Sequence, residues 1–227
     1  MRLALAAALA IIWALPAVAH DIERAEALLT DVAAYRRAAA DAEAIFRLGQ
    51  AVVTLVDALN TDVAAHGTRD LFAERVAQRL QAQAVNVAWS PATHRYTYDL
   101  AAFREYLRRA PRGPSAPEAK FRLMAERFYA TLGTDPDILV GIDVPALQRA
   151  AAEEERFLAE SPGHPRADTV RFFLAVDHYR IARHVSDPAR RAEHARRARQ
   201  ALQQTVERSG EAFDVRAAQT LLERLAR

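Results

Sequence analysis

The sequence of 227 residues contains no cysteine, only seven glycines and a single lysine, Lys120, and these shortages exclude several classes of protein. Without cysteine the chain has no disulfide, no thiol chemistry and no cysteine that could hold a lipid anchor. The scarce glycines form neither a phosphate-cradling loop nor a dinucleotide-binding fingerprint, and neither a nucleophile elbow nor an HExxH zinc motif is present. These absences predict a protein that is not an enzyme and that holds no metal or other cofactor.

A strong excess of one charge is also lacking. The 31 basic and 29 acidic residues nearly balance and are interleaved, whereas a nucleic-acid-binding protein would present a basic face, so we expect no nucleic-acid partner. The densest basic run comprises Arg190, Arg191, Arg196, Arg197 and Arg199. We expect this run to be a solvated helix face that Glu193 and Glu207 partly neutralise. The alternative is contact with anionic lipid, lipopolysaccharide or an acidic partner.

The longest apolar run lies at the amino end, from Leu3 to Leu15, and is followed by the small residues Ala17-Val18-Ala19. This is the pattern of a secretory signal with an A-x-A cleavage site. We therefore expect residues 1–19 to be cut off between Ala19 and His20, which leaves a soluble periplasmic or secreted chain without a transmembrane segment. An uncleaved anchor is the alternative, although the run is shorter than the roughly 20 residues that span a bilayer.

Apolar residues recur every three to four positions through the rest of the chain, which is typical of amphipathic helices. Few glycines and no convincing alternation of period two predict an all-α protein without a sheet. The expected helices are 21–37, 41–65, 68–80, 98–109, 115–132, 145–160, 165–184, 188–208 and 213–225. Gly67 would end the second of these helices, and Thr68 would cap the third.

Two helical regions are expected after the signal, a short bundle in residues 20–90 and an array in residues 91–227. The periodic pattern is interrupted at residues 86–96, which include Trp89. Because large aromatic side chains usually bury most of their area, we expect Trp89 to cover the junction between bundle and array. A tryptophan exposed on a surface loop as a contact point is the alternative.

The array is predicted from a helix pair that occurs twice. The stretch from Phe157 to Tyr179 reads as a helix end, a turn broken by Pro162 and Pro165, and the start of an antiparallel partner. An earlier copy precedes it. Tyr106, Leu107 and Pro111 stand 51 positions before Phe157, Leu158 and Pro162, and after a one-residue slip Leu123, Met124, Ala125 and Tyr129 stand 50 before Phe173, Leu174, Ala175 and Tyr179. Spaced copies of this kind predict two to three stacked, tetratricopeptide-like hairpins that leave a curved groove.

The array also resembles a known family. The matching residues are Phe157-Leu158, Pro162, His164-Pro165, Asp168, Asp187-Pro188 opening a helix, Arg208-Ser209, Ala217 and Leu221-Leu222-Glu223. Over roughly Tyr98 to Arg227 this rhythm is similar to the tetratricopeptide-like units of the BamD (YfiO) outer-membrane assembly lipoproteins. The resemblance implies a helical solenoid that acts as a periplasmic scaffold. The chain differs from that family in lacking a lipid-bearing cysteine and in having Gly210 where a proline usually breaks the last unit.

No group of polar residues has the spacing of a catalytic or metal site. We interpret Glu153-Glu154-Glu155 as a solvated helix face, because consecutive carboxylates point in different directions. His178, His184 and His194 are too far apart for a zinc pair on one helix, and Asp177 and His178 diverge as neighbours. His20, at the expected mature terminus, could bind copper through its amine and ring, but we favour a chance residue at the cleavage site.

The sequence therefore predicts a non-catalytic helical scaffold that binds a protein or peptide partner, with envelope assembly as its expected setting. Two alternatives remain open at this point. One is an envelope structural protein that contacts anionic lipid through its arginine-rich face. The other is a hydrolase or metal-binding enzyme.

Overall fold

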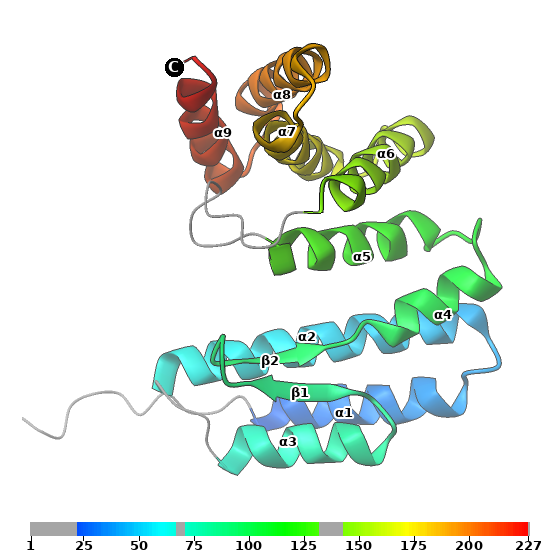
Figure 1. Cartoon of the computed structure of the whole chain (residues 1–227). Coiled ribbons are helices and arrows are strands. Elements are labelled where there is room, and N and C mark those ends of the chain that lie inside the picture. The colour runs from blue at the N-terminus through cyan, green and yellow to red at the C-terminus, as the bar shows by residue number, and fades with distance from the viewer. Residues whose placement is uncertain (1–21, 67–70, 132–142, 227) are drawn as a thin grey trace, which may run out of the picture. The chain divides into compact units, whose positions relative to one another are not determined.

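The computed structural model describes residues 22–66, 71–131 and 143–226 (Figure 1). Within these ranges the chain forms nine helices and one pair of short strands, which confirms the predicted all-α class. None of the helices in these ranges combines the length and the apolar character that crossing a membrane requires. The expected signal segment, the cut between Ala19 and His20, and the helix boundary at Gly67 and Thr68 lie outside the described ranges.

The chain divides into two compact units, Met1–Ala102 and Phe103–Arg227. The first unit contains α1 (Ile22–Arg37), α2 (Ala42–His66) and α3 (Leu71–Ala82), whose ends lie within three residues of the expected ones. Both α2 and α3 pack against α1. The helices form because each buries one apolar stripe, and the buried side chains include Leu29, Val32, Val52, Leu55, Leu59, Val76 and Leu80.

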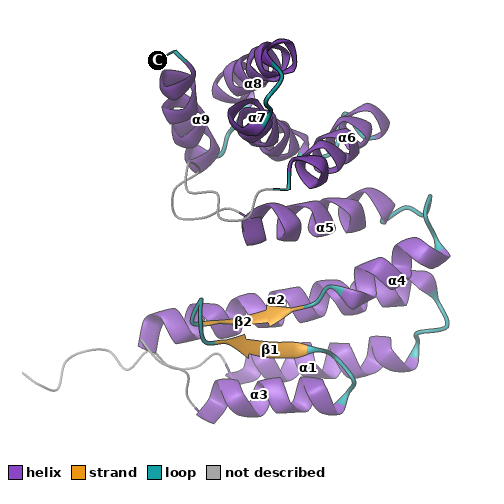
Figure 2. Ribbon diagram, in the orientation of Figure 1, coloured by secondary structure: helices purple, strands orange, loops and turns teal. Residues whose placement is uncertain are grey.

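The expectation of no sheet is wrong, because the first unit also contains a β-hairpin (Figure 2). Strands β1 (Val87–Ser90) and β2 (Arg95–Tyr98) pair antiparallel, with Trp89 opposite Tyr96. Asn60 of α2 holds β2 in place, since its side chain accepts the Tyr96 N–H at 2.7 Å and donates to the Tyr96 carbonyl at 3.0 Å. Trp89 is half-buried and packs edge-on against the Tyr96 ring, so it forms part of this hairpin.

The second unit consists of helices, most of which pack on the next helix along the chain. Helix α4 (Ala101–Arg109) crosses the boundary between the units and is followed by α5 (Ala116–Thr131), α6 (Val144–Glu160), α7 (Ala167–His184), α8 (Pro188–Arg208) and α9 (Ala212–Leu225). The most extensive contacts join α6 to α7, α7 to α8 and α8 to α9. Asp187 caps α8 by accepting the N–H groups of Ala189 and Arg190, as the sequence Asp187-Pro188 predicts.

An aromatic stack joins α5 to α7. Phe173 of α7 is parallel to two rings of α5, Phe128 at 4.1 Å and Phe121 at 6.4 Å between ring centroids. All three side chains belong to one buried cluster, which continues through Val170 and Val176 toward α8 and α9. Burial of a phenylalanine side chain contributes roughly 1.5–3 kcal/mol, so this cluster is a main source of the unit's stability.

The turns α4–α5 and α6–α7 have the same backbone hydrogen bonds at a constant separation of 51 residues. In the first turn Ala110, Gly113 and Ala116 donate to the carbonyls of Tyr106, Ala110 and Gly113. In the second turn Ser161, His164 and Ala167 donate to Phe157, Ser161 and His164. Burial follows the same separation beyond the turns, because Phe121 and Phe172 are both buried, as are Phe128 and Tyr179. The one-residue slip that we expected within this correspondence is therefore wrong.

Two positions differ together between the turns, 106 and 113 in the first turn and 157 and 164 in the second. Tyr106 is fully buried, and its hydroxyl accepts the Ser115 N–H at 3.0 Å, directly beside Gly113. A Cβ atom at Gly113 would lie only 2.3 Å from that hydroxyl oxygen. In the second turn the tyrosine is replaced by Phe157, which has no hydroxyl, and the glycine by His164, whose ring packs edge-on against Phe157 at 5.2 Å. Glycine at position 113 is therefore required by the tyrosine hydroxyl.

We predict that Gly113→Ala destabilises the protein by about 1–3 kcal/mol, because the added methyl overpacks a buried site. The loss should be smaller when Gly113→Ala is introduced together with Tyr106→Phe, which removes the clashing oxygen. Urea unfolding of the two single variants and the double variant measures this coupling. Gly163→Ala is the matched control, since a Cβ there meets nothing within 4 Å. Equal costs of Gly113→Ala in both backgrounds would contradict the explanation.

Candidate functional site

The candidate binding site is a groove in the second unit, a hollow of about 280 Å³. Helices α5 and α6 each contribute residues at the helical spacing i, i+3, i+4 and i+7, so that one stripe of each helix faces the groove. The lining residues are Lys120, Leu123, Met124 and Arg127 of α5, Glu153, Arg156, Phe157 and Glu160 of α6, and Leu107 of α4. The apolar surface of the groove comes from Leu107, Leu123, Met124 and Phe157.

Ion pairs between α5 and α6 border this apolar surface. Lys120 donates to Glu160 at 2.8 Å between Nζ and Oε2, and Arg127 pairs with Glu153. The side chains of these pairs are partly exposed to solvent, so each pair contributes at most about 1 kcal/mol to stability. Their main effect is to fix the polar rim of the groove.

A cluster of buried charged residues lies behind the rim. Arg127 also donates to Glu154 at 3.2 Å, and Glu154 is 0% exposed. Asp177 and Arg180 of α7 are buried as well and form an ion pair at 3.6 Å. The Arg180 guanidinium lies over the Phe128 ring, 5.6 Å from its centroid. The interpretation of Glu153-Glu154-Glu155 as a solvated face is therefore wrong for Glu154, because the middle residue points into the protein.

The two buried carboxyl groups have raised pKa values. Burial, followed by the nearby Asp177 charge, raises the pKa of Glu154 well above its usual range. Burial also raises the pKa of Asp177 to about 6, although Arg180 and Arg127 act in the opposite direction. At neutral pH Asp177 is mostly ionised and neutralises Arg180.

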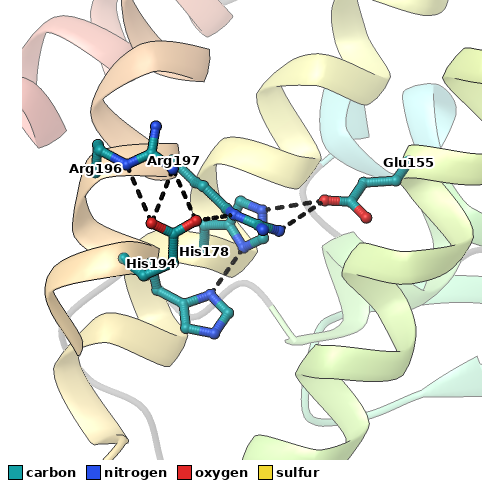
Figure 3. A network of polar contacts seen from close by, with 6 residues as sticks. Glu155, His178, His194, Arg196 and Arg197 are labelled. Atoms are coloured by element: carbon teal, nitrogen blue, oxygen red, sulfur yellow. Dashed lines mark hydrogen bonds and ion pairs between the residues drawn. The ribbon is translucent and has the colours of Figure 1, made fainter. Parts of the chain in front are cut away.

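A second polar network joins α6, α7 and α8 (Figure 3). His178 of α7 is buried, and its Nδ1 lies 3.1 Å from Nδ1 of His194 in α8. The other ring nitrogen of His178, Nε2, lies 3.6 Å from Glu155 of α6. Arg197 of α8 contacts the same Glu155 oxygen at 3.3 Å, so Glu155 connects α6 to both following helices.

The two histidines are neutral at neutral pH. Burial, together with the neighbouring His194 and Arg197, lowers the pKa of His178 to about 4. Burial and the charges of Arg197 and Arg190 also lower the pKa of His194. In a neutral pair one Nδ1 carries a proton and donates it to the other, so the 3.1 Å contact is a hydrogen bond between α7 and α8.

The arginine-rich run is largely paired within its own unit. Glu193 accepts from Arg196 at 2.8 Å and from Arg197 at 2.7 Å. Arg191 donates to the Val185 carbonyl, and Arg199 donates to the Leu225 carbonyl. The expected neutralisation by Glu193 is confirmed. These contacts make the run a weaker candidate for binding anionic lipid than its sequence alone indicates.

Sequence reasoning missed the contact between His178 and His194 because it compared histidines along one helix only. A usable signal was present. The two residues stand eight positions on either side of Ser186, in the short connection that joins α7 to α8. Residues equally far from the turn of an antiparallel helix pair lie opposite each other, so the predicted boundaries at His184 and Pro188 would have placed these histidines together.

The other candidate residues do not combine into a reaction centre. Asp177 and His178 belong to different networks, as expected for neighbours on a helix. His184 is exposed at the end of α7, and His20 lies outside the described ranges. In the part of the chain that the structure describes, no group of three or more histidine, aspartate or glutamate side chains could hold a metal ion.

Comparison of the chain with models of protein families, with curated proteins and with solved structures finds no match. The resemblance to the BamD-like units therefore stays a prediction. The function has to be argued from the groove and from the networks around it.

We predict that His178 makes a contribution to stability that is lost as the pH is lowered from about 6.5 to about 4. Between these values the unfolded chain binds a proton at His178 and the folded chain does not, so protons favour unfolding. The size of this contribution is roughly 1–3 kcal/mol. Asp177 acts in the opposite direction, since its raised pKa makes the folded state take up a proton first between about 6 and 3.8.

Comparing the pH dependence of stability between variants isolates the contribution of His178. His178→Gln should lose less stability than the wild type between pH 7.5 and pH 5 in urea titrations, whereas His184→Gln, at an exposed position, should follow the wild type. A pH dependence unchanged by His178→Gln would show that burial of this ring does not govern the response.

Proposed function

We propose that the second unit is a helical-hairpin scaffold that binds a segment of another polypeptide in the groove of α4, α5 and α6, without covalent chemistry. The supporting observation is the groove itself, an open hollow with an apolar floor and an ion-paired rim. This combination is typical of surfaces that bury a few apolar anchor side chains of a partner and keep the surrounding contacts polar.

The proposed hairpin arrangement supports this function. The α4–α5 and α6–α7 turns correspond at 51 residues, and we propose that these hairpins are copies of one tetratricopeptide-like unit, followed by α8 and α9. Stacked hairpins of this kind hold their exposed helix faces in a fixed order, which makes a preformed binding surface. A preformed groove lowers the entropic cost of binding, because only the partner segment has to become ordered.

The lining residues favour binding over catalysis. The described groove residues are leucine, methionine, phenylalanine, arginine, lysine and glutamate, and both glutamates are engaged by cations. None of these nine residues is a serine, cysteine or histidine that could act as a nucleophile with an adjacent base.

The place of action is proposed from sequence alone. A signal segment at residues 1–19 would deliver the scaffold to the periplasm or outside the cell. There we propose a role in envelope assembly. The mass of the chain recovered from the periplasm tests this step. A mature chain that still begins at Met1 would contradict it.

The binding proposal is tested with a library of displayed random peptides selected on the full-length protein. We expect enriched peptides that contain apolar anchors. Leu123→Glu, which puts a charge on the groove floor, should weaken their binding at least about tenfold, since an apolar anchor would then have to desolvate a charged side chain.

Gln203→Glu is the matched control, because it introduces the same charge at an exposed position of α8 outside the groove. It should leave binding unchanged, and circular dichroism should show that both variants are folded. Failure to enrich any peptide, or equal binding of the enriched peptides to folded Leu123→Glu, would refute the proposal.

A further inference from the structure

The charges that line the groove do not balance. Three are cationic, Lys120, Arg127 and Arg156, and two are anionic, Glu153 and Glu160. Both carboxylates are already occupied, Glu160 by Lys120 and Glu153 by Arg127. Arg156 lines the groove, is exposed, and has no carboxylate within ion-pair distance among the described residues.

The surplus positive charge is concentrated at one end of the groove, around Glu160. The hydrogen bond from Lys120 lowers the pKa of Glu160, and the charges of Arg156 and Arg112 lower it further. Arg112 is exposed in the α4–α5 turn and, like Arg156, lacks a carboxylate partner among the described residues. Three cations therefore surround a single carboxylate at this end, which leaves a positive potential toward solvent.

This positive end adjoins the apolar floor. Arg156 and Glu160 flank Phe157 on the groove face of α6, and Leu107 of α4 lines the same hollow. A partner that places an apolar side chain on the floor would bring its neighbouring side chains close to Arg156. An acidic neighbour would form an ion pair with Arg156, whereas a basic neighbour would be repelled by it.

A second hollow of this unit has no comparable surplus of positive charge. It measures about 290 Å³ and is lined by Arg196 and Arg197 among other residues. There Glu193 pairs with both arginines, and Glu155 pairs with Arg197 as well. The cations of that hollow are therefore already compensated by neighbouring carboxylates.

Building on the proposed function, we infer that the groove selects partner segments in which aspartate or glutamate side chains flank an apolar anchor. Arg156 is the residue that binds the acidic side chain. Because Arg156 is exposed, the selectivity is moderate and depends on salt. One such contact corresponds to a factor of about two to five in affinity, and the contrast between an acidic and a basic partner to roughly tenfold.

The test uses arrays of amidated nonapeptides with a central leucine, methionine or phenylalanine, probed with the labelled full-length protein. The two positions next to the anchor are fixed as aspartate, asparagine or lysine, and the other positions are randomised. A further set has neutral neighbours and a free carboxyl terminus, which separates side-chain carboxylates from a terminal one. Binding is measured at about 50 mM and 500 mM salt, because screening weakens exposed charge contacts.

Two charge-reversal variants complete the experiment. Arg156→Glu should abolish or invert the preference for aspartate over lysine. Arg183→Glu changes the net charge equally at an exposed position of α7 that lines neither hollow, and should keep the preference. The expected result is binding in the order aspartate, asparagine, lysine, with a contrast that shrinks at high salt.

The other outcomes are distinguishable. Peptides that bind equally well with all three neighbours would overturn the charge selectivity and leave the proposed function standing. A preference that survives Arg156→Glu would overturn the role of Arg156, and binding that depends only on the free carboxyl terminus would overturn side-chain recognition. Absence of any peptide binding would remove the proposed function and this inference together.

Discussion

The packing of α5 in the second unit depends on one contact, the stack of Phe173 on Phe128 and Phe121. Phe173 belongs to the α6–α7 hairpin and the other two rings to α5, so the stack joins segments about 50 residues apart in sequence. A single hairpin cannot bury both faces of its helices, and stacking onto a neighbour removes the remaining apolar surface from water. The relative position of α5 and α6, and with it the groove between them, follows from this contact.

Burying these aromatic rings places charged residues in the interior, and their pairing explains the polar geometry. Arg127 contacts buried Glu154 and exposed Glu153 together, so it connects the rim of the groove to the interior. Arg180 is neutralised by Asp177 and lies against Phe128. A buried ion pair contributes little net stability, but removing one partner is costly because a buried charge is left uncompensated. These residues therefore restrict how α5, α6 and α7 can pack.

Much of the fold was predictable because local signals dominate it. Prolines, capping residues and apolar periodicity placed every described helix end within about three residues, as at Asp187-Pro188 and the break after Glu160. The β-hairpin was missed because each strand has only four residues, too few for an alternating pattern to stand out. Tyr96 and Val87 are buried while their neighbours Thr97 and Ala88 are exposed, so the alternation was present but short.

The lining residues of the groove could not be predicted from the sequence. The sequence indicated stacked hairpins and hence a groove, yet the lining side chains depend on which helix faces meet, which is a tertiary property. Glu154 was misread because three consecutive glutamates look uniformly solvated, although the helical turn directs one of them toward Arg127. The His178–His194 contact likewise arises between helices, where spacing rules for a single helix do not apply.

The central claim is that the α4–α5 and α6–α7 hairpins form one cooperative unit, and native-state hydrogen exchange of the full-length protein tests it most directly. The account predicts that slowly exchanging amides of α5 and α7 open with the same free energy. It also predicts that Phe173→Ala lowers both by a similar amount, about 3–5 kcal/mol or down to the limit set by global unfolding. Protection that falls in α7 while α5 is unchanged would show that the hairpins are independent, and the groove between them would lose its structural basis.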